Sequence, residues 1–351
     1  MIHYDVTKSS LAGHASGLLR VNTRLLAELG PAARPGTWLE AARAAGPEDW
    51  FLTGELFSES ERPGFGEFLA VRRCRAAAIF HDAIPLRFPR ITWPHSVARH
   101  PGYMKMLSRF DRVFAISSSS REELLGYWRW IGVEKAPPVD VLRLGADFIP
   151  GRRGQVVHCT QPDAAGYNVQ PDPLLLCVGI LEPRKNQSFL IGVCESLWAE
   201  GLRFSLELVG RVNPVCGREV ADRVADAARR HPGLRYRGPV DDAGMARLYA
   251  AAAAGLFPTL AEGCGLPLLE SLWMGVPVVC SDLPVLLENA SGGGCVAVEA
   301  GNAGAWKSAL RDFLTNAALR ARLGEEARAR RLPTWAEAAA ALRTAMEERR
   351  C

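Results

Sequence analysis

The feature that most constrains this chain is a repeated alternation of short apolar runs with longer segments of helical periodicity. The apolar runs are MIHYDVT, AAAIFHD, RVFAIS and VDVLRLG before residue 150, and LLLCVGI, FSLELVG, LRYRG, AGLFP and VPVVCSD after residue 173. Runs of this length predict strands, and the segments between them place apolar residues at helical spacing. Strands that alternate with helices form parallel sheets covered on both faces. We therefore predict an α/β protein made of two doubly wound, Rossmann-like domains.

The stretch between the two alternating halves has a different composition. Residues 151–173 are rich in Pro, Gly and polar residues, which predicts a linker. It separates an N-terminal domain over residues 1–150 from a C-terminal domain over residues 174–330, and we expect the helical residues 331–351 to pack back toward the N-terminal domain. Ligands of open parallel sheets bind beyond the carboxyl ends of the strands, so two facing sheets would share one interdomain cleft.

The overall charge of the chain is nearly balanced. Its 351 residues carry a net charge of +4, with 48% hydrophobic and 23% charged residues, which is typical of a globular protein. So small a positive excess argues against nucleic acid as a partner and better fits a phosphate-bearing ligand or an anionic membrane surface.

The cysteines and the hydropathy pattern bear on location and metal content. Nine cysteines occur without a Cys-x-x-Cys spacing, so we expect free thiols in a reducing compartment and no structural zinc. The N-terminus has no signal-peptide pattern, and no run of about 18 apolar residues occurs. We therefore expect a cytoplasmic protein.

Two carboxylates flank a tight turn in the stretch EGCGLPLLE, residues 262–270. The turn follows the predicted strand AGLFP, and Pro267 fits the first turn of the helix behind it. Glycines allow the backbone to approach a ligand, and a helix N-terminus favours an anion. Glu270 lies among leucines, where an unpaired carboxylate would be costly. It therefore needs donors, which can be a basic side chain, backbone amides or ligand hydroxyls.

Two other interpretations of this stretch stay open. Gly263 and Gly265 follow a strand, open a helix and precede Asp282 at about the spacing of a dinucleotide-binding fingerprint. Leu268 stands where that fingerprint needs a third small residue, which argues against it. The other interpretation is a structural turn in which Glu270 is paired with an arginine.

Two cations, Arg184 and Lys185, stand side by side in the stretch GILEPRKNQ, between the strand LLLCV and a helix. Cations at a helix N-terminus oppose the helix dipole, so they must serve another purpose. A diphosphate suits them, with Arg as a bidentate fork and Lys as a point charge. A solvated pair of cations is the structural alternative.

Two further candidate segments lie in the N-terminal half. Ser16 and Gly17 open the first predicted helix, where backbone amides can face an anion. His81 and Asp82 end the strand AAAIF. A lone histidine is usually structural, but one beside an aspartate at the carboxyl end of a strand is a candidate for a functional site.

Together these four segments resemble the retaining glycosyltransferases of family 4, which have the GT-B fold. EGCGLPLLE is similar to the family's Glu-x7-Glu motif, LEPRKN to its phosphate-binding segment, SGLLRV to its glycine loop, and HDAIP to a stretch of its mannosyl- and rhamnosyltransferases. The resemblance runs along almost the whole chain and is strongest over residues 174–290. Four motifs in matching order and spacing make it specific.

The resemblance implies a role for each of these positions. Glu262 would hold hydroxyls of the donor sugar, Glu270 the ribose diol, and Arg184 and Lys185 the diphosphate. The backbone of Ser16, Gly17 and Gly179 would lie near the phosphates. The sugar would contact His81, Asp82 and the amides of Gly263, Cys264, Gly265 and Leu266. The base would contact the backbone of Val240.

The resemblance also implies the chemistry. The leaving phosphate gains negative charge, which Arg184, Lys185 and helix N-termini would stabilise in place of a metal. No Asp-x-Asp triplet occurs, so neither a metal nor a cofactor is expected. The family offers no carboxylate nucleophile in a settled position, so retention would follow same-face attack. Two positions depart from the family: Ile180 stands where Arg is frequent, and Cys264 where an aromatic residue is usual.

These observations predict a retaining, metal-independent glycosyltransferase that moves a hexose to a glycan or lipid-linked acceptor in surface-polysaccharide assembly, with GDP-mannose as the first choice of donor. Residues 86–112 and 128–130 mix basic and aromatic side chains. We expect this face to meet the acceptor at the inner face of an anionic membrane, unless it is a solvated helix with tryptophans in the core. A nucleotide-sugar 2-epimerase and a non-catalytic nucleotide-sugar-binding module are the alternatives.

Overall fold

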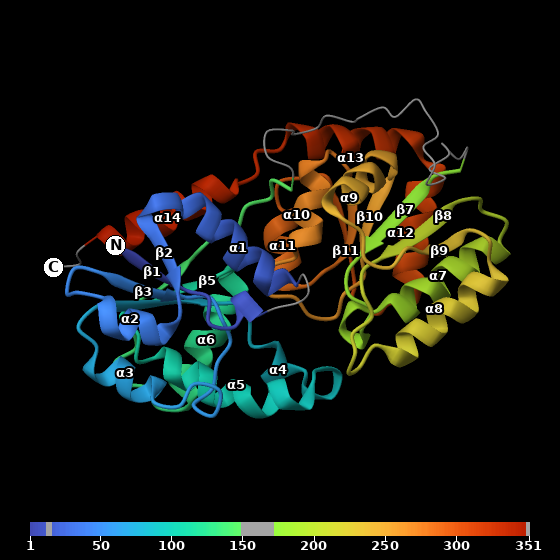
Figure 1. Cartoon of the computed structure of the whole chain (residues 1–351). Helices are drawn as coiled ribbons and strands as arrows, with labels where there is room; N and C mark the ends of the chain where they lie inside the picture. The colour runs from blue at the N-terminus through green and yellow to red at the C-terminus, as the bar shows by residue number, and fades with distance from the viewer. Residues whose placement is uncertain (12–15, 149–171, 349–351) are drawn as a thin grey trace. The chain divides into compact units, whose positions relative to one another are not determined.

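The computed structural model describes residues 1–11, 16–148 and 172–348, which form two compact units (Figure 1). The N-terminal unit comprises Met1–Gly145 together with the chain from Pro333 onward, and the C-terminal unit comprises Ala146–Leu332. The predicted linker over residues 151–173 lies outside the described residues except for its last two positions.

The N-terminal unit is built on a six-stranded parallel sheet with the order β2-β1-β3-β4-β5-β6. The central strands are apolar and buried, as strands covered on both faces must be. The chain passes from β1 outward to β2 and then returns to β3 on the other side, so the strand order reverses between β1 and β3. The bounds are β1 Ile2–Asp5, β2 Ala33–Gly36, β3 Trp50–Thr53, β4 Arg75–Phe80, β5 Arg112–Ala115 and β6 Val139–Val141.

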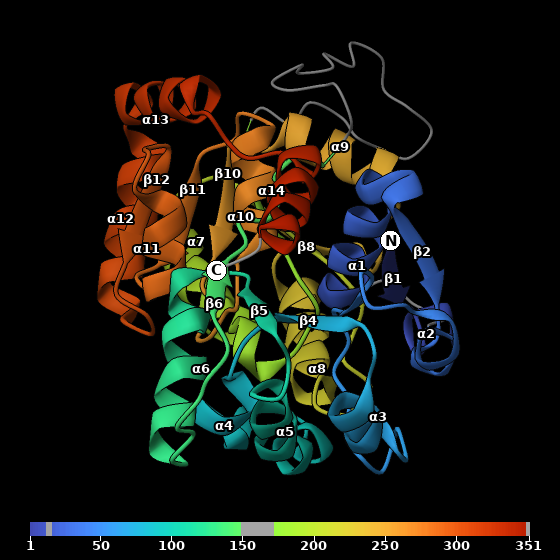
Figure 2. The same ribbon diagram turned by 90° about the vertical axis from the view of Figure 1, so that its left-hand side faces the viewer.

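The helices of this unit connect the strands and pack against the sheet (Figure 2). A cluster of aromatic and aliphatic side chains from β3, β4, α3, α5 and α6 forms the larger part of the core. The helices are α1 Gly17–Leu29, α2 Trp38–Ala44, α3 Phe65–Val71, α4 Ile84–Arg87, α5 Pro94–Leu107, α6 Ser118–Trp130 and α14 Trp335–Glu347, with short 3-10 turns at Ser9–Leu11, Gly30–Ala32 and Pro89–Ile91.

The last helix, α14, belongs to the N-terminal unit, where it packs against α1. A capping box between Thr334 and Glu337 sets its start, because each residue's side chain bonds the other's backbone nitrogen. Gly145 lies so close to this start that a Cβ there would fall 2.2 Å from the backbone nitrogen of Trp335. Only glycine fits at this crossing.

The C-terminal unit contains a second six-stranded parallel sheet, with the order β12-β11-β10-β7-β8-β9. Its core is a separate cluster in which α7, α8 and α12 pack on the sheet. The strands are β7 Leu174–Val178, β8 Ser205–Val209, β9 Leu234–Tyr236, β10 Ala254–Phe257, β11 Val278–Ser281 and β12 Cys295–Val298. The helices are α7 Gln187–Ala199, α8 Arg218–Arg230, α9 Asp242–Ala251, α10 Leu266–Trp273, α11 Pro284–Ala290, α12 Ala303–Thr315 and α13 Ala317–Ala329, with the 3-10 turn η4 at Pro183–Lys185.

The prediction of two doubly wound parallel α/β sheets is confirmed. In the second sheet the chain runs outward from β7 to β9 and then returns to β10, so the strand order reverses between β7 and β10. Loops that follow these two strands flank the crevice where doubly wound sheets bind ligands. Within the described ranges, no helix has both the length and the apolar character that crossing a bilayer demands.

Candidate active site

The loops that follow β7 and β10 are tied together at the reversal of strand order. After β7 the chain makes the 3-10 turn η4 and then enters α7 through Asn186, whose φ of 59° makes it the one non-glycine residue with positive φ among those the structure describes. The Asn186 side chain donates to the carbonyl of Pro258, 3.2 Å away in the loop after β10. This arrangement places Arg184 and Lys185 next to the residues that precede EGCGLPLLE.

Lys185 and Glu262 form an ion pair between these two loops. Their side chains are only 12% and 8% exposed, and the Lys185 ammonium lies 5.3 Å from the centre of the Phe257 ring. Arg184 adds a second cation, with its Nη1 atom 3.5 Å from Oε2 of Glu262. The predicted phosphate cations and the predicted sugar carboxylate therefore meet in one cluster.

The ionisation of this pair reflects burial and charge together. Burial lowers the pKa of Lys185, and the neighbouring carboxylate of Glu262 offsets only part of that effect. Burial opposes ionisation of Glu262 as well, but Lys185 and Arg184 together outweigh it, so the pKa of this carboxyl lies below its usual value. Glu262 is therefore an ionised acceptor of hydrogen bonds.

Arg184 is held mainly by Glu182. Its Nε and Nη2 atoms donate to the same Oε1 atom of Glu182 at 2.9 and 2.6 Å, and its Nη1 donates to the carbonyl of Ala261 at 2.8 Å. The alternative of a solvated Arg-Lys pair is wrong, because both cations have carboxylate partners and little exposure. The sequence did not single out Glu182.

The turn in EGCGLPLLE is a left-handed one. Gly265 has a φ of 85° directly before α10, and a Cβ there would fall 2.7 Å from the Leu286 side chain. The neighbouring Cys264 is 8% exposed and its carbonyl accepts from the Asn289 amide at 2.6 Å. Burial, with the nearby Glu262 carboxylate and others, raises the pKa of the Cys264 thiol to about 12. The thiol is therefore protonated, while Gly263 and Leu266 complete the turn into α10.

Glu270 lies in α10 and is 5% exposed. Its Oε2 atom is 3.3 Å from the hydroxyl of Tyr249 on α9, which also lies 3.4 Å from the carbonyl of Pro267. The expected need for a donor at this buried carboxylate is met in part by a tyrosine, a partner that the sequence did not indicate because it lies on another helix.

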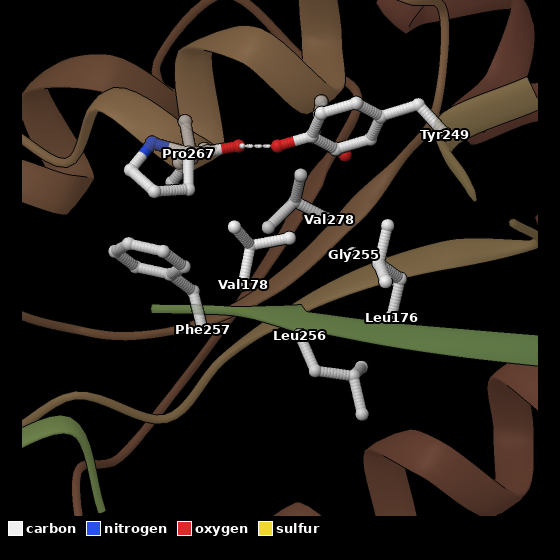
Figure 3. Close-up of a pocket in the computed structure, with 10 residues that line it drawn as sticks. Leu176, Val178, Tyr249, Gly255, Leu256, Phe257, Pro267 and Val278 are labelled. Carbon is white, nitrogen blue, oxygen red and sulfur yellow. Dashed lines mark hydrogen bonds between the residues drawn. The ribbon is translucent and has the colours of Figure 1, made fainter. Parts of the chain in front are cut away.

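An apolar pocket lies between the sheet and α9 and α10 (Figure 3). The Tyr249 hydroxyl and the Pro267 carbonyl meet at its edge. Its lining contains no charged side chain, so it does not coincide with the cluster around Lys185 and Glu262. It is lined by Leu176, Val178, Tyr249, Gly255, Leu256, Phe257, Pro267, Leu268, Ser271 and Val278.

Two other predicted positions, Gly179 and Val240, belong to the C-terminal unit. Gly179 follows β7, donates its N–H to the carbonyl of Val209 at 2.8 Å and lies beside the stem of Lys185. Its carbonyl is so near Gly210, whose φ is 142°, that a Cβ on Gly210 would fall 2.1 Å from it. Val240 is half-buried and precedes the N-cap of α9.

His81 and Asp82 follow β4 in the N-terminal unit. His81 is 5% exposed and its Nε2 donates to the carbonyl of Gly54 at 2.8 Å, while burial lowers its pKa. The Asp82 carboxylate accepts a hydrogen bond from the backbone nitrogen of Ile84 at 3.0 Å. The backbone carbonyl of Asp82 accepts one from Nε2 of His100 at 2.8 Å. Both residues are thus built into the turn after β4, and their predicted roles at the sugar stay predictions.

Ser16 and Gly17 begin α1. The Ser16 hydroxyl is the N-cap and accepts from the backbone nitrogen of Leu19 at 3.2 Å. Gly17 is exposed, and a Cβ there would have nothing within 4 Å, so packing inside the described residues does not require glycine at this position. The predicted phosphate contact of Gly17 stays a prediction.

A buried ionic network, which was not predicted from the sequence, lies at the ends of β1 and β3. Arg62 is 1% exposed and forms ion pairs with Asp5 at 2.7 Å and Glu55 at 2.5 Å. Glu55 also accepts the backbone N–H groups of Lys8 and Ser9 at 2.9 and 2.7 Å, which fixes the loop after β1. Carboxylates at two strand ends were the available signal, but nothing in the sequence indicated Arg62 as their partner.

Across residues 1–11, 16–148 and 172–348, no three His, Cys, Asp or Glu side chains are grouped so that they could hold a metal ion.

Sequence relatives of this chain are glycosyltransferases. Residues 172–316 match the family described as Glycosyl transferases group 1. The chain is 27% identical over 325 residues to the serotype-specific mannosyltransferase WbdA of Escherichia coli, with 80% of this chain and 39% of WbdA covered. It is 29% identical over 284 residues to the O-antigen chain mannosyltransferase B of Escherichia coli, with 78% of this chain and 70% of that protein covered. The chain spans less than two fifths of the length of the WbdA proteins it matches.

Solved structures show the same architecture. Anabaena HepE in complex with UDP-glucose superposes with a TM-score of 0.74 at 14% identity, covering 98% of this chain and 99% of HepE. Sucrose-phosphate synthase from Thermosynechococcus elongatus superposes with a TM-score of 0.67 at 19% identity, covering 88% of this chain and 75% of that one. At these identities the likeness establishes the fold. Residues 172–316 therefore match the Glycosyl transferases group 1 family, and the chain has the GT-B fold.

Proposed function

We propose that this chain is a retaining glycosyltransferase of family 4 that moves a hexose from a nucleoside diphosphate sugar to a glycan or lipid-linked acceptor. The observation that carries the proposal is the ion pair of Lys185 and Glu262 beyond the carboxyl ends of β7 and β10. Doubly wound sheets bind their ligands at such a reversal of strand order. A buried cation beside a buried carboxylate suits a ligand with phosphate at one end and hydroxyls at the other.

In this proposal the two charges divide the donor between them. Lys185 stabilises the negative charge that develops on the leaving diphosphate, and Glu262 accepts hydrogen bonds from the sugar hydroxyls. Arg184 stays within 3.5 Å of Glu262, so the carboxylate keeps a cation when Lys185 turns to the phosphate. Glu270 accepts hydrogen bonds from the two ribose hydroxyls. The Tyr249 hydroxyl bonds the Oε2 atom of Glu270 and so helps to hold its carboxylate in place.

Retention and independence of metal ions belong to the same proposal. Lys185 and the N-terminus of α10 supply the positive charge that the leaving group needs, and no cofactor takes part. The acceptor attacks the face that the diphosphate leaves, and a phosphate oxygen takes its proton. Activity that survives EDTA, and a product of unchanged anomeric configuration in NMR spectra, are the expected results. Inversion at the anomeric carbon would refute the retaining mechanism.

GDP-mannose is the proposed donor, and surface-polysaccharide assembly the proposed setting. The support is that two Escherichia coli relatives are named mannosyltransferases, one of them for the O-antigen chain. None of the comparisons favours the epimerase or the silent binding module. A thermal-shift screen with GDP-mannose, GDP-fucose, UDP-glucose and UDP tests the donor. Stabilisation by none of these compounds would overturn the proposal.

Lys185 provides the sharpest test of catalysis. Lys185→Ala removes the ammonium that meets the leaving phosphate, so we expect turnover to fall by a factor of about a thousand. Glu195→Gln is the control, because Glu195 on α7 also takes part in ion pairs, with Arg223 and Arg230 on α8, but lies away from the two loops. Wild-type turnover in the Lys185 variant would remove that residue from the mechanism.

A membrane face is the last part of the proposal. Trp128 is buried, in agreement with the interpretation of a core tryptophan, but Trp130 and Trp93 are 81% and 44% exposed. Arg87 and Arg129 lie nearby in sequence and are exposed. We propose that these side chains contact an anionic membrane on the cytoplasmic side. Co-sedimentation with phosphatidylglycerol vesicles at low salt should be lost in the double variant Trp93→Ala/Trp130→Ala; no binding by the wild type would refute the membrane contact.

A further inference from the structure

Arg184 and Lys185 are neighbours with very different surroundings. Lys185 points its ammonium at Glu262 and at the face of Phe257. Arg184 uses three of its N–H groups on protein acceptors, two of them on Glu182 and one on the carbonyl of Ala261. A guanidinium held in this way on both edges of its fork has its direction fixed by the protein.

Glu182 is in turn held on its other oxygen. It is 8% exposed, and its Oε2 atom accepts from the Asn213 amide at 2.8 Å. Asn213 lies in the loop after β8 and is fixed by its own backbone N–H, which donates to Leu181 at 3.0 Å. The contacts therefore run across three adjacent strand ends: from β8, through Glu182 and Arg184 after β7, to Ala261 after β10.

The backbone of Arg184 repeats this connection. Its carbonyl accepts from the backbone nitrogen of Leu260 at 2.8 Å and from the hydroxyl of Thr259 at 3.1 Å. With the side-chain bond to Ala261, Arg184 holds three consecutive residues of the loop after β10. The next residue is Glu262, whose Oε2 lies 3.5 Å from Arg184. Arg184 therefore determines where the Glu262 carboxylate lies.

We propose that Arg184 is a positioning residue rather than a ligand of the diphosphate, and that Glu182 and Asn213 orient it so that the loop after β10 presents Glu262 to the donor sugar. This inference rests on the proposed function. It replaces the expectation, drawn from the resemblance, that Arg184 and Lys185 share the diphosphate. The charge of Arg184 is already matched by Glu182, which leaves Lys185 to meet the phosphates.

Glu182→Gln separates the two roles because they predict opposite results. If Arg184 positions Glu262, the variant loosens it, and we expect kcat to fall by about a hundredfold while the Kd for GDP stays near the wild-type value. If Arg184 binds the diphosphate, loss of the competing carboxylate frees it, and GDP should bind about tenfold more tightly. Calorimetry with GDP and initial rates with GDP-mannose measure both quantities. Tighter GDP binding with unchanged kcat overturns the inference.

Arg184→Met gives the complementary result. The positioning role predicts a loss in kcat with little change in the Kd for GDP, whereas a diphosphate ligand would cost about tenfold in that Kd. The fall of kcat/KM on the acid side should also move to higher pH. Glu262 is faced by Lys185, Arg184 and the Thr259 hydroxyl, and loss of one of its two cations raises the pKa of its carboxyl group. An unmoved acid limb with weaker GDP binding refutes the proposal.

Controls keep failure of the inference distinct from failure of the proposed function. Wild-type protein that binds neither GDP nor UDP would refute the proposed function itself. Glu195→Gln weakens the ion pairs of Glu195 on α7 with Arg223 and Arg230 on α8, and it should leave GDP binding and kcat unchanged. Asn213→Ala removes the hydrogen bond to Glu182, together with the two that the Asn213 Oδ1 atom accepts from the backbone nitrogens of Val215 and Cys216. It serves as the milder variant if Glu182→Gln does not fold, and it should lower kcat without changing the Kd for GDP; tighter GDP binding would count against the inference.

Discussion

Lys185 and Glu262 stand 77 residues apart in the sequence, yet their side chains form an ion pair that is almost closed to solvent. The pair joins the loops after two neighbouring strands of the second sheet. It therefore contributes both to the connection between these loops and to the charge that a donor would meet. The two contributions can be separated by experiment.

Stability and activity should respond differently to loss of the pair. Lys185→Met leaves the buried Glu262 carboxylate with Arg184 alone, and we expect the free energy of unfolding to drop by about 3 kcal/mol. The double variant Lys185→Met/Glu262→Gln removes both charges and should recover most of that loss while staying inactive. Urea denaturation of the two single variants and the double variant measures the coupling. A double variant as unstable as the sum of the single ones would show that the charges do not interact.

The acid stability of the protein should carry the signature of Glu262. Its pKa in the folded chain lies below the ordinary value of 4.5, so its stabilising effect is fully present above that value and is lost as the pH falls through the folded pKa. Glu262→Gln should therefore be less stable than the wild type at neutral pH, and this loss of stability should become smaller below about pH 4.5. Denaturant midpoints between pH 3 and pH 7 test this, and a difference independent of pH would contradict it.

Nucleotide binding should depend on Glu270 more than on its tyrosine partner. Glu270→Ala removes the carboxylate proposed to accept the ribose diol, and the Kd for GDP should rise by at least about tenfold. Tyr249→Phe keeps the carboxylate and removes one hydrogen bond, which should cost about 1 kcal/mol of stability with a smaller effect on Kd. Titration calorimetry compares the two variants. Equal effects on GDP binding would assign the ribose contact elsewhere.

Cys264 should be chemically silent yet matter for the choice of sugar. With a pKa of about 12 and little exposure, its thiol should escape alkylation by iodoacetamide at pH 8, whereas the more exposed Cys216 should react sooner than Cys264. Peptide mass spectrometry distinguishes the two sites. Cys264→Phe introduces the aromatic residue that is usual at this position in the glycosyltransferases that the sequence resembles, and it should change the ratio of kcat/KM values for GDP-mannose and UDP-glucose. Rapid labelling of Cys264 in the native protein would contradict the burial seen here.

The sequence predicted the strands that position the site, because apolar runs such as LLLCV and AGLFP are covered on both faces, but it predicted no strand order. It missed β2, β3 and β12, each only four residues long, because ARPG has no strand composition and WFLT and CVAV are too short to show a period. The Glu-x7-Glu turn and the Arg-Lys pair were recognisable because their residues are adjacent in sequence.

The partners of these residues were not recognisable, since they depend on how distant elements pack. Tyr249 reaches Glu270 from α9, and Asn213 reaches Glu182 from the loop after β8. Glu55 and Arg62 illustrate the same limit, because only the folded sheet brings Glu55 beside Asp5 at the ends of two paired strands. The sequence motifs identified side chains that can bind or react, whereas tertiary packing determines which of them bond to one another.

The return of α14 to the N-terminal unit has a consequence for synthesis on the ribosome. Residues 335–347 pack against α1 and bury Trp335, Leu342 and Met346, so the first unit cannot complete its core until these late residues have been translated. The C-terminal unit, continuous from Ala146 to Leu332, has no such requirement. We therefore expect the domain that begins second to be the first to reach its native state, with the apolar side of α1 left for a chaperone to shield in the interval.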